Sequence, residues 1–446
     1  MQTRRDHVQA YQFAVGRLAT ALVSGDPGRG ESPTRRASLG TFFGVGVVIL
    51  LCVGFGVYGL VAPAADHSWR ASGAYIVEKE TGNRYLYVDG VLRPVRNYAS
   101  VRLFAPSPAA HDVSRKDLEG IPHGPAVGIP GAPDEVPTPA GILGNSWTRC
   151  LRPQFAGGQS VDFSPAGRTT AVPEDRQALL AAADGTRYLL WKGAKYRVPD
   201  QSTLVALGLD TDRQTTAPAD WLAAVPDGVA LKAIRPAGQG GPAGTVAGHP
   251  VTVGQLFSTD TAAGERHYYV MTQHGVARTN ATEYALLSAE PHAPAPMSVP
   301  SSALAAVRLA DDPGMAGTLP DVAGAPAVST DGQAVCLAQR VDGSALDTRV
   351  VLERGEAATG SRAVLVPPGH GLLVSSREEA LRKATRPRTY LVTDDGTAYP
   401  LAGDDVTAAL GLSGLVSLLS DDVISLLPAG PVLAMPGSTG GGGAGV

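Results

Sequence analysis

The segment from Tyr390 to Leu412, YLVTDDGTAYPLAGDDVTAALGL, is one of four related stretches in a chain of 446 residues. Similar stretches begin at Tyr188 (YLLWKGAKYRVPDQSTLVALGL), at Tyr85 (YLYVDGVLRPVRNYASVRLF) and, with weaker similarity, at Tyr269 (YVMTQHGVARTNATEYALL). Each stretch starts with a β-rich run, passes a glycine and continues into a second short run, which is the pattern of a β-hairpin. The chain therefore repeats one small structural unit four times, and these copies decide its architecture.

A turn and a helix start occupy corresponding places in all four copies. Glycine readily adopts the left-handed backbone conformation of a tight turn, and Asn or Asp at an N-cap accepts a hydrogen bond from the first turn of a helix. The predicted turn glycines are Gly90, Gly193, Gly275 and Gly396. The predicted N-caps, each followed by a short amphipathic helix, are Asn97, Asp200, Asn280 and Asp404. Because a lone hairpin is only marginally stable in water, we expect the helix to cover one face of each hairpin.

A longer similarity follows copies two and four, where residues 218–231 (PADWLAAVPDGVAL) match residues 420–433 (SDDVISLLPAGPVL). Related segments follow copy one, at 114–128, and copy three, at 299–307. We interpret the unit as a hairpin, a helix, a second short helix and a Pro-x-Gly exit strand. The starting tyrosines are 103, 81 and 121 residues apart, so the copies do not form a solenoid of constant period.

Residues 37–61 form an uncharged run of 25 residues, ASLGTFFGVGVVILLCVGFGVYGLV, which is long enough to cross a bilayer. A cleaved signal peptide is the alternative, but the run is about twice the usual length of a signal-peptide core and follows a 36-residue leader. The leader has a net charge of +3 and the rest of the chain about −7, which favours a cytoplasmic N-terminus. We predict a cytoplasmic segment at 1–36, a transmembrane helix at 37–62 and a periplasmic or extracytoplasmic domain at 66–435.

The leader contains apolar residues at alternating steps of three and four, which is helical spacing. These residues are Val8, Tyr11, Val15, Leu18 and Leu22. A basic amphipathic helix of this kind lies on the inner leaflet of a membrane or docks in a groove of another protein.

The exported part divides into repeats near 73–104, 179–210, 262–290 and 387–413, two core segments at about 115–175 and 300–380, and a flexible Gly-rich tail at 436–446. Each core segment contains one cysteine, Cys150 or Cys336. Since disulfides persist outside the cytoplasm, a bond between them is the simplest interpretation, and two separate buried thiols are the alternative. We expect two halves, each made of repeat, core segment and repeat, tied together by this disulfide.

Sequence motifs for reactive chemistry are absent. The chain has no G-x-x-x-x-G-K-[ST], G-x-S-x-G, H-E-x-x-H or C-x-x-C, and the G-x-G-x-x-G at 54–59 lies inside the apolar run. The balance of 37 basic and 41 acidic residues is not that of a nucleic-acid-binding protein. We predict no catalytic residue, no cofactor-binding residue and no metal site.

Several phrases taken together resemble the EccB family, the single-span membrane component of the type VII (ESX) secretion system of actinobacteria. They are the leader RRDHVQAYQFAVGRLATALVSGDP, GAYIVEKETGNRYLYVDGVLRPVRNYASVRL (73–103), GIPGAPDEVP (128–137), WTRC (147–150), AVLVPPGHGLLV (363–374), TYLVTDDGTAYPL (389–401) and LLPAGPVL (426–433). The resemblance implies an α+β fold with an N-terminal amphipathic helix, a single transmembrane helix and an elongated periplasmic domain. In that domain four hairpin-plus-helix repeats surround a β-rich core linked by the Cys150–Cys336 disulfide.

The resemblance also implies a function. The chain would be a structural and assembly subunit of an inner-membrane secretion complex, with EccC-, EccD- and EccE-type subunits and copies of itself as partners. The family name carries an ATPase label, so ATP hydrolysis is one alternative, although no phosphate-loop motif supports an ATP cofactor. A cell-wall glycan-binding module is the other, because aromatic side chains in the repeats could stack on sugars. These side chains are Tyr85, Tyr87, Tyr188, Trp191, Tyr268, Tyr269, Tyr390 and Tyr399.

Overall fold

The computed structural model describes residues 4–24, 34–61, 68–105, 109–261, 264–310 and 317–436. The chain divides into two units, Met1–Trp69 and Arg70–Val446, and each is treated by itself. The linker after residue 24 and most of the predicted tail, from 437 onward, lie outside the described residues.

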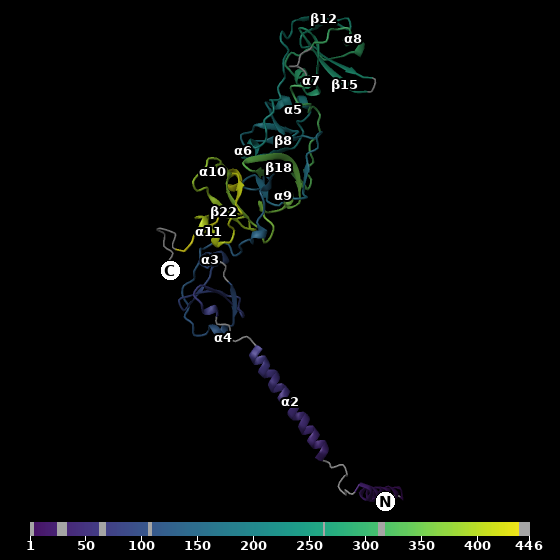
Figure 1. The fold of residues 1–446 in the computed structure, drawn as a ribbon. Coiled ribbons are helices and arrows are strands. Elements are labelled where there is room, and N and C mark those ends of the chain that lie inside the picture. Colours follow the sequence, from purple (N-terminus) through teal and green to yellow (C-terminus); the bar gives the residue numbers. More distant parts are fainter. Residues whose placement is uncertain are drawn as a thin grey trace. The chain divides into compact units, whose positions relative to one another are not determined.

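The first unit contains two helices, α1 (Arg4–Ser24) and α2 (Thr34–Val61), seen in Figure 1. The apolar residues of the predicted stripe on α1 are exposed, from 46% at Val15 to 83% at Leu22. Within α2, the segment Gly40–Tyr58 is long and apolar enough to cross a membrane. Both predicted helices are therefore present, and each leaves apolar surface uncovered within the described chain.

Each copy in the second unit has a four-stranded sheet and two helices that follow its third and fourth strands, and copy four has a further helix, α10, after its first strand. The copy therefore contains two strands more than the predicted unit of hairpin, two helices and exit strand. Three antiparallel strands are followed by a helix, a fourth strand parallel to the first, and a second short helix. The strand order is the same in all four copies, with the third strand at one edge and the fourth at the other. The first strand was missed because it precedes the tyrosine at which each similar stretch begins, and the fourth because it pairs only after the crossover helix has returned the chain.

The helices and strands of the four copies have the following bounds, in chain order. Copy one contains β1 (Ala74–Glu78), β2 (Arg84–Val88), β3 (Val91–Pro94), α3 (Tyr98–Phe104), β4 (Ala110–Val113) and α4 (Arg115–Leu118). Copy two contains β8 (Ala178–Ala181), β9 (Arg187–Trp191), β10 (Ala194–Val198), α5 (Gln201–Leu207), β11 (Gln214–Thr216) and α6 (Ala219–Ala223). Copy three contains β14 (Leu256–Asp260), β15 (Arg266–Thr272), β16 (Gly275–Thr279), α7 (Ala281–Ser288), β17 (Met297–Ser298) and α8 (Ser301–Ala305), preceded by the hairpin of β12 (Pro242–Val246) and β13 (His249–Thr252). Copy four contains β21 (Leu372–Ser376), α10 (Arg377–Leu381), β22 (Thr389–Val392), β23 (Ala398–Leu401), α11 (Asp404–Ala409), β24 (Ser417–Leu419) and α12 (Asp421–Ile424).

The Pro-x-Gly exit segment of copies one, two and four returns to the free edge of the third strand, where it makes parallel bridges such as Lys195 to Asp227. In copy two its glycine lies under an aromatic ring, because a Cβ on Gly228 would stand 2.3 Å from the ring of Tyr196. Copy four uses the same contact between Gly430 and Tyr399. The glycine therefore permits a large side chain on the third strand to cover the exit segment.

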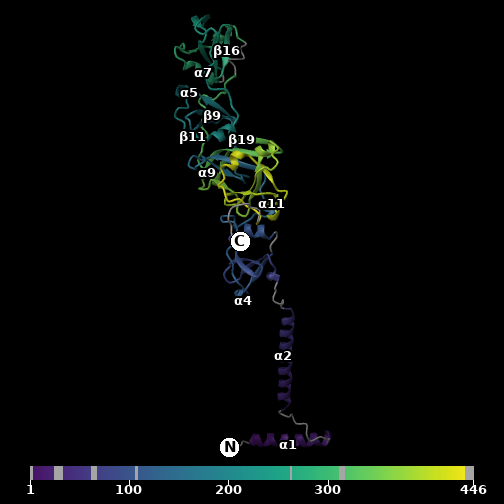
Figure 2. The same cartoon turned by 90° about the vertical axis from the view of Figure 1, so that its left-hand side faces the viewer.

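The copies pack in pairs through their first helices. Helix α3 of copy one packs on α11 of copy four, where Leu103 and Val406 belong to one apolar cluster. Helix α5 of copy two packs on α7 of copy three, where Leu204 and Leu286 share another. Figure 2 shows α5 and α7 as neighbours. Each half of the chain thus contributes one copy to each pair.

A six-stranded central sheet joins the two halves, in the order β20-β6-β5-β18-β19-β7. Its strands are β5 (Ser146–Leu151), β6 (Gln159–Asp162), β7 (Thr169–Ala171), β18 (Gln333–Asp342), β19 (Ala345–Arg354) and β20 (Val364–Leu365), with η2 (Pro139–Gly141) before them and α9 (Glu356–Thr359) between β19 and β20. The third strand of each half pairs with the other half, β7 with β19 and β20 with β6. The two-half arrangement expected from spacing is present, with an exchange of edge strands that spacing could not reveal.

Candidate functional site

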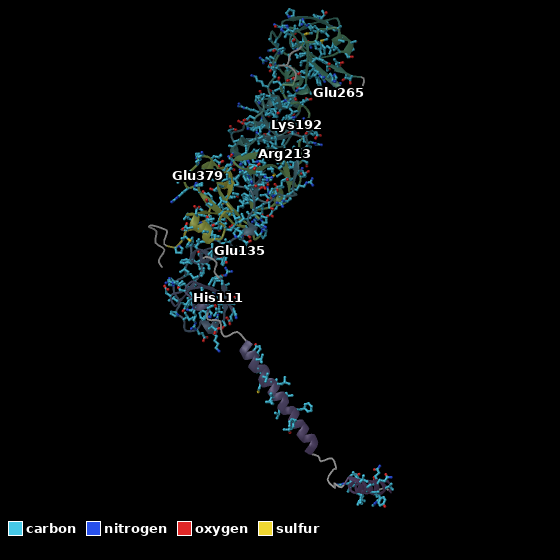
Figure 3. All side chains as sticks on the ribbon, viewed as in Figure 1. His111, Glu135, Lys192, Arg213, Glu265 and Glu379 are labelled. Carbon is cyan, nitrogen blue, oxygen red and sulfur yellow. A yellow bond between two sulfur atoms is a disulfide. The ribbon has the colours of Figure 1, made fainter. Side chains whose placement is uncertain are left out.

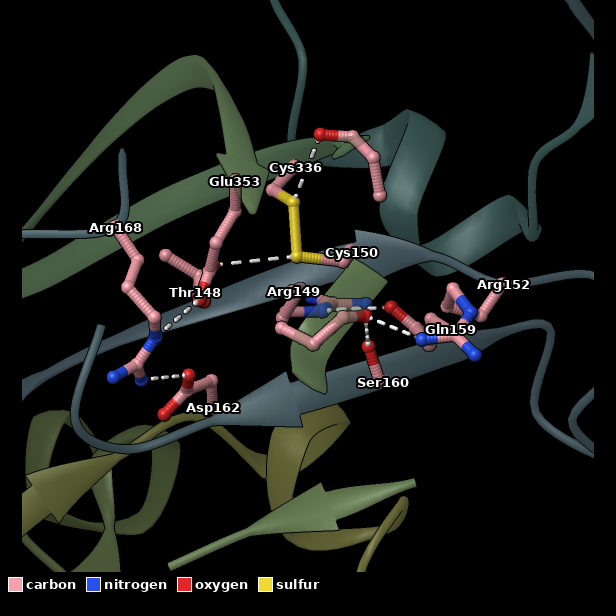
Figure 4. Close-up of a disulfide and its surroundings, with 12 residues drawn as sticks. Thr148, Arg149, Cys150, Arg152, Gln159, Ser160, Asp162, Arg168, Cys336 and Glu353 are labelled. Atoms are coloured by element: carbon pink, nitrogen blue, oxygen red, sulfur yellow. Dashed lines mark hydrogen bonds and ion pairs between the residues drawn. A yellow bond between two sulfur atoms is a disulfide. The ribbon is translucent and has the colours of Figure 1, made fainter. Parts of the chain in front are cut away.

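The disulfide lies at the middle of the central sheet, where Cys150 on β5 and Cys336 on β18 stand directly opposite each other. Both cysteines are fully buried, and Figure 4 shows the bond crossing between the two central strands. The predicted pairing is therefore confirmed. The bond joins residues 186 positions apart, and the loop-entropy model values such a cross-link at roughly 4–5 kcal/mol.

Arg149, next to Cys150, is a fully buried cation at the meeting point of the central sheet and two copies. Its guanidinium donates to Asp220 at the start of α6 in copy two and to Asp422 at the start of α12 in copy four. The Nε of Arg149 donates to the side chain of Gln159 at 3.0 Å. A buried charge is tolerated only when it is paired and hydrogen-bonded, and here the partners come from both halves of the chain. We call this set of Arg149, Asp220 and Asp422 the arginine bracket.

Asp220 and Asp422 occupy the same position of the repeated unit, six residues before the proline that opens the exit segment. In copy three an arginine stands in place of that proline. The corresponding residue is Lys116 in copy one and Ser302 in copy three. Copies two and four, which meet Arg149, are called the inner copies below, and copies one and three the outer copies. The acidic position is thus confined to the inner copies, which are the two that neutralise the buried arginine.

Glu353 on β19 lies against the disulfide with its side chain fully buried. Its Oε2 accepts from the Thr148 hydroxyl and lies 3.4 Å from the Sγ of Cys150, while its Oε1 is 3.8 Å from the Nε of Arg168. The pKa of Glu353 is raised to about 8, chiefly by burial. Asp162 also raises this pKa, whereas the Thr148 hydroxyl and Arg168 lower it. The core of the sheet therefore holds a carboxyl group that retains its proton near neutral pH.

The structure places the predicted turn glycines as follows. Gly90, Gly193 and Gly396 adopt left-handed backbone at φ of 82°, 79° and 83°, in the loops between the second and third strands. Gly275 follows the two-residue turn of copy three directly, as the first residue of β16, and it also has positive φ, at 130°. A Cβ there would stand 2.1 Å from the carbonyl oxygen of Arg308, so this glycine permits the close approach of the exit segment.

The predicted N-caps differ between copies. Asn97, Asp200 and Asn280 cap α3, α5 and α7 by accepting from Ser100, Thr203 and Glu283. Asp404 was wrongly predicted as a cap: it is the first residue of α11, and Gly403 stands at the cap in extended backbone. Since the helix starts one residue earlier than expected, Asp404 and Asp405 both lie in its first turn, where negative charge is favourable.

The asparagine caps also fasten the segment that leaves each outer copy. The Nδ2 of Asn97 donates to the carbonyl of Ile129 at 2.8 Å, and that of Asn280 donates to the carbonyl of Leu319 at 2.7 Å. A carboxylate could serve as the cap but has no hydrogen to donate to these carbonyls.

The predicted disulfide residues come together, whereas the turn and cap residues stay in their separate copies. The sequence analysis did not single out Arg149, Glu353 or the acidic role of Asp220 and Asp422. The matching segments 218–231 and 420–433 contained a signal for the two aspartates, since both have Asp at the third position. A buried arginine or glutamate inside a β-rich run has no comparable sequence signal.

A cavity of about 250 Å³ lies in copy three, beside the start of β15 and the N-terminus of α7. It is lined by charges of both signs, including Glu265, Arg266, Arg278 and Asp321. The neighbouring helix start is closed by the capping box of Asn280 and Glu283, so those groups are already used. Figure 3 likewise shows labelled charged side chains, among them Lys192 and Glu265, on different parts of the chain.

The repeat aromatics divide into two groups. Trp191 and Tyr399 are buried in apolar clusters of their copies, at 8% and 5% exposure. The other six proposed for sugar stacking are half-buried: Tyr85, Tyr87, Tyr188, Tyr268, Tyr269 and Tyr390. Two of the eight therefore belong to the core.

Residues 1–437 match the sequence profile of a protein family described as type VII secretion system ESX-1, transport TM domain B. The chain belongs to this family, the EccB family of type VII secretion. The ESX-1 secretion system ATPase EccB1 of Mycolicibacterium smegmatis (strain MKD8) is 27% identical over 97% of this chain and 94% of the relative. The ESX-2 secretion system ATPase EccB2 of Mycobacterium tuberculosis (strain ATCC 25618 / H37Rv) is 29% identical over 81% of this chain and 80% of the relative.

Solved structures share the fold of this EccB-family chain. A chain of an intact ESX-5 inner membrane complex is similar over 100% of this chain and 98% of its own length, with a TM-score of 0.53 and 23% identity. A chain of an EccB3 dimer from the ESX-3 core complex is similar over 81% of this chain and 98% of its own length, with a TM-score of 0.50 and 23% identity. At this identity the likeness concerns the fold.

Proposed function

We propose that this chain is a structural and assembly subunit of a type VII secretion complex in the inner membrane. Helix α2 anchors it as a single span, α1 stays in the cytoplasm, and the unit from Arg70 to Val446 stands in the periplasm. Its partners are EccC-, EccD- and EccE-type membrane subunits and a second copy of itself. The observation that carries the proposal is the family match over residues 1–437, which includes both helices and all four copies.

The geometry supports a scaffold in two ways. The disulfide and the arginine bracket connect both halves, so a force on one copy is transmitted to the central sheet and the opposite half. The apolar stripe of α1 is exposed, and an amphipathic helix of this type binds a groove or a membrane surface. The relatives described as members of an inner membrane complex and of a dimer are consistent with such partners.

The test is purification of the tagged full-length chain from its native membrane in mild detergent, followed by mass spectrometry of the proteins that accompany it. We expect membrane secretion subunits with the unaltered chain and their loss in the variant Tyr11→Asp/Leu18→Asp, which places charge in the stripe. The variant Gln9→Asp/Thr20→Asp adds the same charge on the opposite face of α1 and serves as the matched control. Recovery of the chain without secretion subunits would contradict the proposal.

ATP hydrolysis is a second candidate because the relatives carry the word ATPase in their names. Equilibrium binding of a fluorescent ATP analogue to the purified chain distinguishes ATP hydrolysis from the scaffold function. Saturable binding with a stoichiometry near one would favour the enzyme, and the Asp variants of α1 should then leave it unchanged.

A further inference from the structure

The outer strand of the β18–β19 hairpin is only partly covered on its far side. Strand β19 pairs with β18 along its whole length, from Ala345 to Arg354, without a shift in register. On its other side β7 pairs only with Val351–Glu353. Among the residues that the structure describes, no further strand pairs with β19, so Leu346–Val350 form a free sheet edge. Such an edge presents unpaired backbone groups to which another strand can bind.

The alternation of an antiparallel strand shows which backbone groups of this free edge point outward. The N–H of Arg354 donates to the carbonyl of Arg168 at 3.2 Å, on the side of β7. The N–H and C=O of one residue point to the same side of a strand, and successive residues alternate. Counted back from Arg354, the backbone groups of Val350, Thr348 and Leu346 therefore also point to this side, beyond the end of β7.

The side chains of the free edge are complementary to those of a second, antiparallel copy of the same edge. When Thr348 stands opposite its own counterpart, Asp347 of each copy faces Arg349 of the other, and Leu346 faces Val350. This register uses the free edge from end to end. It also places the outward backbone groups opposite one another, so that they form the hydrogen-bonded pairs of the ladder. The charged residues then occupy the non-hydrogen-bonded pairs, where side chains approach most closely.

Both charged side chains are available for this contact. Arg349 and Asp347 are 76% and 54% exposed, and they pair with each other along the strand at 3.0 Å. Charges of one sign on an edge strand repel a second copy and so prevent association. Here the two signs are placed symmetrically about Thr348, and opposite charges in facing positions stabilise a strand pair. The free edge is therefore attractive to its own copy.

We propose that two copies of this chain associate through their free edges, as an antiparallel pair of β19 strands centred on Thr348. The contact is isologous, because each copy contributes the same residues, and it closes after two copies. It joins the central sheets of the two chains into one continuous sheet. The inference rests on the proposed function, which includes a second copy of the chain among the partners, and it names the surface through which that copy binds.

The test measures self-association of the full-length chain in detergent. The chain is produced with two different tags in a host that has no type VII secretion subunits, one tag is captured, and the other is quantified. The unaltered chain should capture its second copy. Asp347→Arg alone, or Arg349→Asp alone, should reduce the capture about tenfold or more, because each places like charges opposite each other. Asp342→Arg, at an exposed position of β18 in the same hairpin, is the matched control and should leave the capture unchanged.

Mixing the two single variants gives a result that a folding defect cannot produce. The Asp347→Arg chain should capture the Arg349→Asp chain as well as the unaltered chain captures itself, since each arginine then faces an aspartate. The double variant Asp347→Arg/Arg349→Asp should likewise capture itself. The inference is overturned if the unaltered chain captures no second copy, if the single variants capture themselves normally, or if mixing them does not restore the capture.

The purification from native membrane decides the proposed function separately. If secretion subunits accompany the chain there while self-capture is insensitive to the charges of the free edge, only this surface is wrong. If no secretion subunits accompany it, the proposed function is wrong, whatever the capture experiment shows.

Discussion

The inner and outer copies share one strand order and the helices that follow the third and fourth strands, but they have different polar anchors. In the outer copies an asparagine cap holds the departing chain, Asn97 on Ile129 and Asn280 on Leu319. In the inner copies an aspartate at the second helix instead reaches into the central sheet and pairs with Arg149. The same strand order thus serves two locations with different polar side chains at the first cap and at the second short helix.

The acidic anchor of the inner copies lies at a single position of the unit. Asp220 and Asp422 pair with one guanidinium, whereas Lys116 and Ser302 occupy the position in the outer copies. Lysine at either inner position would put a second cation beside a fully buried arginine. A negative charge at this position therefore distinguishes the inner copies, which pair with Arg149 of the central sheet, from the outer copies, which do not.

The largest expected effect follows from removing the centre of the bracket. Arg149→Met should lower the free energy of unfolding by about 3 kcal/mol, since two carboxylates lose their common partner. Each carboxylate is still about one-third exposed, at 35% for Asp220 and 33% for Asp422, which keeps the loss at the lower end for a broken buried pair. Urea unfolding of the full-length chain, followed by tryptophan fluorescence, measures it, because Trp147 and Trp221 are buried in the same region.

Arg340→Met is the matched control for that measurement, because Arg340 is exposed on β18 of the same sheet. A change within about 0.5 kcal/mol is expected there. Equal losses for the two variants would mean that the bracket contributes nothing beyond a surface arginine.

A separate effect, read as a slope rather than as a single loss, concerns the dependence of stability on pH. Glu353 has a folded pKa of about 8 against an unfolded value of 4.5, so between these values the folded chain keeps a proton that the unfolded chain has lost. Stability should therefore fall as pH rises from 4.5 towards 8, with a slope of at most about 1.4 kcal/mol per pH unit. Glu353→Gln should flatten this slope in urea titrations of the oxidised chain at several pH values, and an unchanged slope would assign the dependence to another group.

A smaller effect is expected from the two arms of the bracket taken singly. Asp220→Asn and Asp422→Asn should each cost about 1–2 kcal/mol, because the arginine keeps one anionic partner and a neutral hydrogen bond replaces the other. Ser302→Ala, at the same position of outer copy three, should stay within about 0.5 kcal/mol. If Ser302→Ala is as harmful as the aspartate variants, the distinction between inner and outer copies at this position is wrong.

The smallest effect concerns the caps of the outer copies. Asn97→Asp and Asn280→Asp keep the acceptor for the helix but remove the donor to Ile129 or Leu319, so a loss of about 1 kcal/mol is expected in the same urea experiment. Asp200→Asn in an inner copy exchanges two good caps and should be close to neutral. A similar loss in all three variants would show that capping alone matters.

Local patterns made much of the unit predictable. The turn glycines Gly90 and Gly193 and the caps Asn97 and Asp200 are determined by neighbours a few residues away, and they lie in the predicted elements. Asp404 was misassigned because Gly403, two residues after the end of β23, stands at the cap of α11. Gly275 also meets Arg308 across the fold, a contact that its place beside the turn does not reveal. The fourth strand of each copy was missed because its partner, the first strand, is distant in the sequence, as Tyr75 and Ala110 show in copy one.

The sequence by itself determined the leader helix, the apolar helix, four related units and one cysteine in each core segment, because helical spacing, turn chemistry and repetition are local properties. Only the tertiary structure decided which copies pack together, that the halves exchange β7 and β20, and that Arg149, Asp220 and Asp422 meet. These choices depend on contacts between segments tens to hundreds of residues apart. Whether a buried charge is tolerated depends on where its partners lie in the fold, and no local sequence pattern encodes the positions of partners that are distant in the chain.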